Sequence, residues 1–209
     1  MPAYLRVRPL QGPIVETLQQ KLDRVLREEV AVVPYDTRWP DLFRREKEHL
    51  LTSFPPCLLR RVEHFGSTAV PGLAAKPIID VLAEVTNLSE TRAVIAPVLE
   101  AQGYDYFWRP TSGDDGPPFY AWFIRRDPHT RVRTHHIHMV EPQFQQHWDR
   151  LLFRDYLIAY PHVAQQYQAL KLRLAAVHPH DRVRYTQEKA AFVSAATEQA
   201  CRLFGGREA

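Results

Sequence analysis

The chain has 209 residues, of which 45% are hydrophobic and 24% charged, an ordinary composition for a globular protein with one core. Its net charge of +3, from 27 basic and 24 acidic residues, is too small to indicate nucleic-acid binding by itself. No stretch approaches the roughly 20 apolar residues that span a bilayer, and no apolar run follows a basic start, so we expect neither a membrane segment nor a signal peptide.

The two cysteines indicate the redox environment. Cys57 and Cys201 lie far apart and form no CxxC motif, so the sequence predicts neither a zinc site nor a disulfide framework. A reduced, cytoplasmic protein is the expectation that follows.

The first 30 residues are expected to form an extension that carries an amphipathic helix. Its apolar side chains fall on one helical face. They are Ile14, Leu18, Leu22, Val25, Leu26 and Val30. This face either packs on its own domain or forms the contact of a homodimer.

Residues 31–142 are predicted to form an α/β core within a single domain, 31–209. Alternating and apolar runs indicate the strands, and a three-to-four spacing of apolar residues indicates the helices. The predicted strands cover 30–33, 58–65, 77–85, 104–108, 119–126 and 131–140, and the predicted helices cover 40–53 and 87–102. The stretch 111–118 is rich in Gly, Asp and Pro and is predicted to be a loop.

Residues 143–209 are predicted to be helical, with helices at about 143–160, 161–177 and 181–204 separated by prolines. The fold class is therefore α/β (α+β), with a mixed β-sheet flanked by helices, a C-terminal helical bundle and an N-terminal helix. We expect Asp80 and the strand at 134–140 to face one shared cleft. The C-terminal helices should close one wall of that cleft and not form a separate domain, because they carry too many apolar side chains to stand alone.

The turn after the strand at 58–65 is a candidate phosphate site. Gly66 allows a sharp turn with uncovered backbone N–H groups, and the hydroxyls of Ser67 and Thr68 add donors. Such a turn can form a nest for anionic oxygens. The alternative is an ordinary tight turn.

Asp80 interrupts the almost continuously apolar strand at 77–85. A carboxylate in such a strand is costly unless it is paired or holds a cation. Asp80 is therefore either a metal ligand or the structural partner of Lys76 or of an arginine.

Four strings of residues resemble one family. They are E-H-F-G-S-T-A-V-P-G-L-A-A-K-P-I-I-D at 63–80, R-T-H-H-I-H-M-V-E at 133–141, L-L-F-R-D-Y-L at 151–157 and Y-T-Q-E-K-A-A-F at 185–192. From Val32 to the C-terminus the chain resembles the GrpB family, a branch of the polymerase-β-type nucleotidyltransferase superfamily. The resemblance implies metal-dependent transfer of a nucleotidyl group from a nucleoside triphosphate to a small-molecule or protein acceptor. Asp80 would then hold the metal, and Gly66, Ser67 and Thr68 would contact the phosphates.

The sequence departs from the superfamily at the second carboxylate. Leu82 stands two residues after Asp80, and Glu84 lies about 13 Å along the strand at ~3.3 Å per residue. His136 and His138 share one face of a later strand and are candidates to complete the ligand set and to take part in catalysis. Imidazole ligands would favour Mn²⁺, or even Zn²⁺, over Mg²⁺. The alternative is that a single histidine lies in the site.

Basic residues are expected to neutralise the phosphates of a bound small-molecule nucleotide. The candidates are Lys76, Arg133 and Lys189, and for each the alternative is a solvated surface charge. A second interpretation of the function is an accessory domain that binds a nucleotide or metabolite without catalysis. GrpB-like domains resemble ones fused to dephospho-coenzyme A kinase, so this interpretation implies a helper linked to the coenzyme A pathway.

Overall fold

The computed structural model describes residues 29–111 and 118–205 of the chain. The amphipathic helix expected in the first 30 residues, and the dimer contact considered for it, lie outside the described residues except for positions 29 and 30. Within the described part, no helix is long and apolar enough to cross a membrane.

One five-stranded sheet forms the centre of the molecule, in the order β1-β2-β5-β4-β3. The strands are β1 (Leu59–Phe65), β2 (Ile79–Val85), β3 (Asp105–Pro110), β4 (Phe119–Arg126) and β5 (Arg133–Val140). The pairing of β2 with β5 is parallel and the other three pairings are antiparallel. The mixed sheet predicted from the sequence is confirmed.

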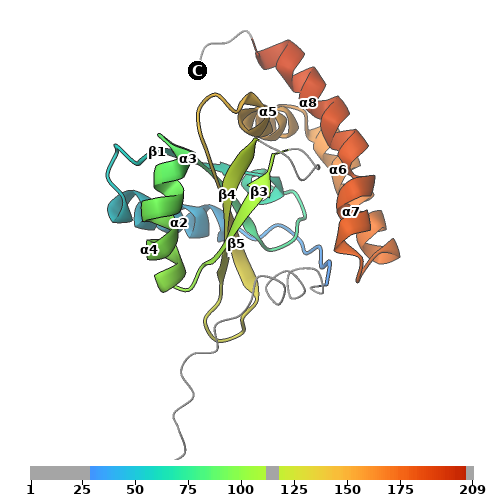
Figure 1. Ribbon diagram of the computed structural model, residues 1–209. Coiled ribbons are helices and arrows are strands. Elements are labelled where there is room, and N and C mark those ends of the chain that lie inside the picture. Colours follow the sequence, from blue (N-terminus) through green and yellow to red (C-terminus); the bar gives the residue numbers. More distant parts are fainter. Residues whose placement is uncertain (1–28, 112–117, 206–209) are drawn as a thin grey trace, which may run out of the picture.

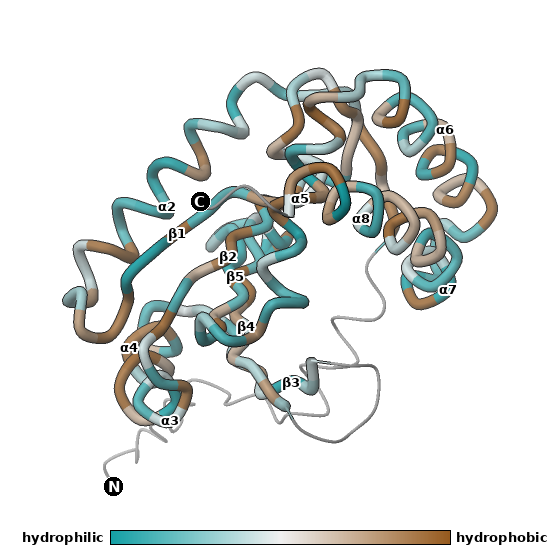
Figure 2. Tube along the Cα trace, turned by 90° about the horizontal axis from the view of Figure 1, so that it is seen from above, coloured by the Kyte–Doolittle hydropathy of each residue, from teal (hydrophilic) through white to brown (hydrophobic). Residues whose placement is uncertain are grey.

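Helices cover both faces of the sheet (Figure 1). On one side lie α2 (Trp39–Ser53), the short α3 (Leu88–Glu90), the π-helical turn η2 (Thr91–Ile95) and α4 (Ala96–Ala101). Toward the other side lie α5 (Gln145–Ala159), α6 (Pro161–Val177), α7 (Arg182–Glu188) and α8 (Ala190–Phe204). Figure 2, viewed at right angles to Figure 1, shows the strands running between these two groups.

Alternation along the strands produces two separate cores. Val81 and Ile137 point to the face covered by α2 and α4, where they are fully buried. Leu82 and Trp122 point to the opposite face and pack with Leu151 of α5. Successive side chains of a strand point to opposite faces of the sheet, so the position of each apolar residue decides which group of helices it meets. Burial of each large apolar side chain contributes about 1.5–3 kcal/mol to stability, which fixes this arrangement.

The C-terminal helices also pack on the segment between β1 and β2, which begins with the 3-10 turn η1 (Ser67–Ala69). Val70 and Leu73 of that segment share a core with Phe153 and Tyr167. The side-chain oxygen of Gln168 in α6 accepts a hydrogen bond from the backbone N–H of Ala74 at 2.7 Å. This packing places α6 directly over the loop that precedes Asp80.

Three predicted elements differ from the structure. The helix expected over 181–204 is split at Lys189 into α7 and α8. Lys189 keeps a φ of −84° and a ψ of −12°, which lie in the helical region. The helical spacing of apolar residues therefore continues across the break. The helix expected over 87–102 contains the π-helical turn η2 ahead of Pro97, which has no N–H to donate. The strand expected at 30–33 is reduced to a single bridge between Val33 and Ala75.

Candidate functional site

Gly66 and Asp80 are in direct contact at the end of β1. The register of the sheet pairs Phe65 with Asp80, so the next residue, Gly66, turns over the carboxylate. Gly66 has a φ of +74°, and a Cβ at this position would lie 2.5 Å from Oδ2 of Asp80. A side chain would therefore clash with Asp80, and only glycine lets the backbone approach the carboxylate this closely.

Asp80 is hydrogen-bonded to His136 across the parallel pair of strands. The register places the two residues opposite one another, and Nδ1 of His136 lies 3.2 Å from Oδ1 of Asp80. The Asp80 side chain remains 29% exposed and that of His136 only 10%. Among the described residues, Nε2 of His136 is buried without a hydrogen-bond partner.

The pair consists of an ionised carboxylate and a neutral imidazole at neutral pH. Burial would raise the pKa of Asp80, but the hydrogen bond from His136, the charge that His136 gains when it is protonated in acid, and the charges of Lys76 and Lys189 together lower it. Burial lowers the pKa of His136 to about 4, and the nearby carboxylate compensates only in part. Nδ1 of His136 is therefore the donor and Oδ1 of Asp80 the acceptor.

His138 lies on the same face of the sheet but in a different environment. It is opposite Leu82, which is fully buried. Nδ1 of His138 lies 3.2 Å from a guanidinium nitrogen of Arg150 in α5, and its ring stacks on Tyr120. Burial, followed by the charge of Arg150, holds the pKa of His138 well below its usual value. Nδ1 of His138 is thus in hydrogen-bond contact with Arg150.

The two loop hydroxyls point in different directions. The Thr68 side chain is buried, where its hydroxyl donates to the carbonyl oxygen of Ile78 at 3.3 Å and lies 3.0 Å from Nε2 of His64. Thr68 therefore holds the loop together. The hydroxyl of Ser67 faces α6 and accepts a hydrogen bond from Nζ of Lys171 at 2.9 Å.

Lys171 is a residue of the site that the sequence analysis did not identify. It is 2% exposed, and its ammonium group also donates to the carbonyl oxygen of Ala74. Burial, with a contribution from the charge of Lys189, lowers its pKa to about 7. One signal was present in the sequence, because Lys171 falls on the same face of α6 as Val163, Tyr167 and Leu174, all of them buried.

Lys76 and Lys189 meet at one aromatic ring. Their Nζ atoms lie 5.0 Å and 5.2 Å from the centre of the Tyr185 ring, which is 1% exposed. Both charges act on Asp80 and lower its pKa. The fold thus brings together two of the three basic residues that the sequence suggested for phosphate binding.

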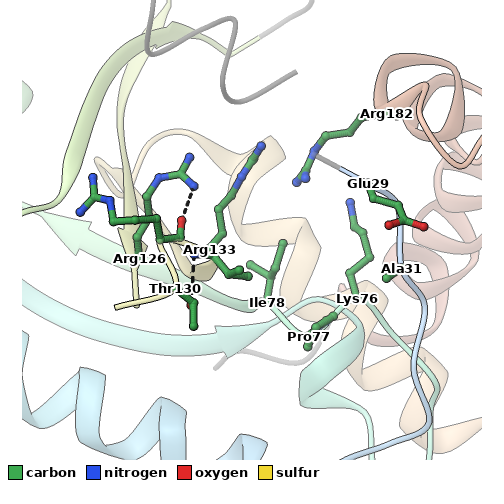
Figure 3. A pocket seen from close by; sticks show the side chains of 11 residues that line it. Glu29, Ala31, Lys76, Pro77, Ile78, Arg126, Thr130, Arg133 and Arg182 are labelled. Carbon is green, nitrogen blue, oxygen red and sulfur yellow. Dashed lines mark hydrogen bonds between the residues drawn. The ribbon is translucent and has the colours of Figure 1, made fainter. Parts of the chain in front are cut away.

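The third of these basic residues, Arg133, lines a neighbouring pocket of about 410 Å³ (Figure 3). Its walls come from the segment before β2, the hairpin between β4 and β5, residues 29 and 31, and the start of α7. Lys76 and Ile78 line this pocket as well, which places it next to the Asp80 loop.

The carboxylate and imidazole groups of the described residues do not form a complete metal-binding set. No three or more His, Cys, Asp or Glu side chains in the described ranges are grouped so that they could hold one ion. Asp80 and, if Nδ1 gives up its proton, His136 therefore offer at most two ligands, and a bound cation would need the rest from water or from a substrate.

The family model for the GrpB protein matches residues 29–199, which include the Gly66 loop, Asp80 and the histidine strand. The chain belongs to the GrpB family. A GrpB structure from Enterococcus faecalis superposes with a TM-score of 0.72 at 32% identity, covering 83% of this chain and 99% of that one. The polymerase-β-type superfamily placement is consistent with this family.

Other GrpB relatives differ in length. The glutamate-rich protein GrpB of Alkalihalophilus pseudofirmus is 37% identical over 165 residues, which cover 79% of this chain and 92% of that protein. The UPF0157 protein YqkA of Bacillus subtilis is 37% identical over 184 residues, and the chain spans only 50% of its length. A dephospho-CoA kinase of Mycolicibacterium paratuberculosis matches more weakly, with 30% identity over 165 residues and 40% of the kinase covered.

Proposed function

We propose that this GrpB protein binds a nucleoside triphosphate beside Asp80 and transfers its nucleotidyl group to a small-molecule or protein acceptor. The contact between Gly66 and Asp80 carries the proposal. It places the backbone of a glycine turn, suited to phosphate oxygens, against a carboxylate suited to a divalent cation.

The spacing of Asp80 and His136 is compatible with two ligands of one divalent ion. Ligands about 2.1 Å from an ion lie about 3.0–3.4 Å apart in octahedral or tetrahedral geometry. The Oδ1 to Nδ1 distance of 3.2 Å falls within that range, but Nδ1 is the hydrogen-bond donor in the metal-free protein and would have to give up its proton to bind an ion. Magnesium commonly takes one or two protein ligands and completes its shell with phosphate oxygens and water, and the imidazole would favour manganese or zinc. His138 is left out of this set because Arg150 engages it.

The other residues of the site have separate roles. Lys76 and Lys189 would offset the negative charge of the phosphates. Lys171 holds the hydroxyl of Ser67 in place and so fixes the shape of the loop. Catalysis of this kind relies on positioning and on electrostatic stabilisation, to which a bound cation would add by neutralising charge on the phosphates.

In the proposed reaction, an acceptor oxygen bonds to the α-phosphorus of the triphosphate. The bond between that phosphorus and the oxygen bridging to the β-phosphate breaks, and pyrophosphate leaves. The proton of the acceptor hydroxyl passes to water.

The test combines calorimetric titration with release of pyrophosphate. Wild type should bind a nucleoside triphosphate with Mn²⁺ or Mg²⁺ and not with chelator. Asp80→Asn should lose that binding, and the matched control Glu84→Gln, on the same strand and face, should keep it. Binding that is equal with and without metal, or that survives in Asp80→Asn, contradicts the role given to Asp80.

A second candidate is a nucleotide-binding accessory domain without transfer activity. Leu82 favours it, because this fully buried residue stands where a second metal-binding carboxylate is expected. The match to a dephospho-CoA kinase, of which the similar region is only a part, also supports a helper role. Tight nucleotide binding with no release of pyrophosphate in the presence of varied acceptors would favour this candidate over the transferase.

A further inference from the structure

The pocket next to the Asp80 loop has the size of a small-molecule site. Its volume of about 410 Å³ lies within the usual range for ligand pockets, roughly 300–1,000 Å³. Apolar side chains, Pro77, Ile78 and Val132, form part of its wall. Ile78 lies two residues before Asp80 on the chain, so a ligand in the pocket would sit beside the proposed nucleotide site.

Basic residues predominate in the described lining of the pocket. Its described lining contains five basic residues, Lys76, Arg126, Arg131, Arg133 and Arg182, and one acid, Glu29. The Arg126 guanidinium is held in place by its neighbours. It donates hydrogen bonds to the Asp105 carboxylate and to the carbonyl oxygen of Arg131, both at 2.9 Å. The other described basic residues of the lining, Lys76, Arg131, Arg133 and Arg182, form the rest of the basic wall.

Three basic side chains converge in the pocket from three separate segments of the chain. Figure 3 shows the side chains of Lys76, Arg133 and Arg182 reaching toward one another across the pocket. Burial, and then the charge of Arg182, holds the pKa of Lys76 well below its usual value. Basic groups that converge from several directions are suited to bind one anion through charge-assisted hydrogen bonds.

We propose that this pocket binds the phosphate group of the acceptor, which makes the acceptor a phosphate-bearing small molecule. Arg133 and Arg182 would grip the phosphate, since guanidinium groups match phosphate oxygens in geometry and charge. The apolar wall would contact the carbon skeleton. Arg133 is thereby assigned to the acceptor and not to the nucleotide. The identification of the ligand as the acceptor rests on the proposed function, whereas the binding of phosphate in this pocket does not.

The experiment uses inorganic phosphate as the probe and thermal melting as the readout, in chelator. Phosphate should raise the melting temperature of wild type and of Asp80→Asn, because the pocket does not need Asp80. The apparent affinity should fall about tenfold or more in Arg182→Ala, as expected for loss of a charge-assisted contact. Arg184→Ala, a matched control on the exposed side of α7, should respond like wild type, and Arg182→Lys should recover part of the affinity.

The outcomes separate the two proposals. A phosphate response that is absent in wild type, or equal in wild type and Arg182→Ala, overturns the pocket assignment. A response that depends on Arg182, in a protein that binds no nucleoside triphosphate, supports the phosphate site and contradicts the proposed function. Metal-dependent nucleotide binding should persist in Arg182→Ala, and its loss there would place Arg182 in the nucleotide site and contradict the assignment to the acceptor.

Discussion

Oδ2 of Asp80 lies against the backbone of Gly66, so close that a Cβ on Gly66 would come within 2.5 Å of it. Two residues 14 positions apart in sequence are thereby in contact at the centre of the proposed site. The contact gives a direct test, because a single methyl group should separate them.

Gly66→Ala should lower the free energy of unfolding by roughly 1–3 kcal/mol and abolish metal-dependent nucleotide binding, because the methyl displaces Asp80. Gly72→Ala is the matched control, since its φ is +76° but nothing lies within 4 Å of an added Cβ. The control should cost only about 1 kcal/mol, the strain of the backbone alone, and keep nucleotide binding. Denaturant unfolding and calorimetry measure both effects, and equal losses in the two variants would contradict the importance of the contact.

Asp80→Asn should lower the stability of the metal-free protein by roughly 1–3 kcal/mol, because the ionised carboxylate accepts a hydrogen bond from His136. The pKa of Asp80 is lowered in the folded state, so its contribution is present above the unfolded value of about 3.9 and is lost as the pH falls through the folded value. Unfolding measured in chelator between pH 7 and pH 3 should show the two proteins converging in acid. A variant as stable as wild type at pH 7 would show that the carboxylate is unsatisfied without a cation.

Lys171→Met tests the buried lysine through its pH dependence. The folded-state pKa of Lys171 is about 7, below its ordinary value of 10.5, so the unfolded chain binds more protons between these two pH values. Wild type should therefore gain stability relative to Lys171→Met as the pH rises from about 7 to about 10. Denaturant melts across this range measure the difference. A difference that does not change with pH would show that the lysine keeps its ordinary pKa.

Glu46→Gln tests a buried network on the opposite face of the sheet. The Glu46 carboxylate is fully buried, accepts a hydrogen bond from the Tyr104 hydroxyl at 2.8 Å and is paired with Arg125. Loss of the charge should lower the free energy of unfolding by roughly 1–3 kcal/mol, as for a charged hydrogen bond, and leave nucleotide and phosphate binding unchanged. Glu48→Gln, exposed on the same helix, should change stability by less than about 0.5 kcal/mol. A loss of ligand binding in Glu46→Gln would show that the two faces of the sheet are coupled.

The sequence alone determined the strands, most helices and the family. The alternation of apolar residues along a strand and the family motif from Glu63 to Asp80 involve residues that are close in sequence, so both can be recognised without knowing the fold. The same two-residue period placed His136 and His138 on one face of β5. This period could not predict that the two histidines have different partners, because the partners come from other elements. Asp80 is hydrogen-bonded to His136, and Arg150 contacts His138.

Only the tertiary structure decided which cations surround the loop. Lys171 reaches Ser67 from 104 positions away, and Arg182 comes from a helix that the sequence predicted but could not orient. Local patterns record which face of a helix is apolar and carry no information on what that face will meet. The packing of α6 and α7 against the segment between β1 and β2, driven by burial of Val70, Leu73 and Tyr185, is what gathers these charges beside Asp80.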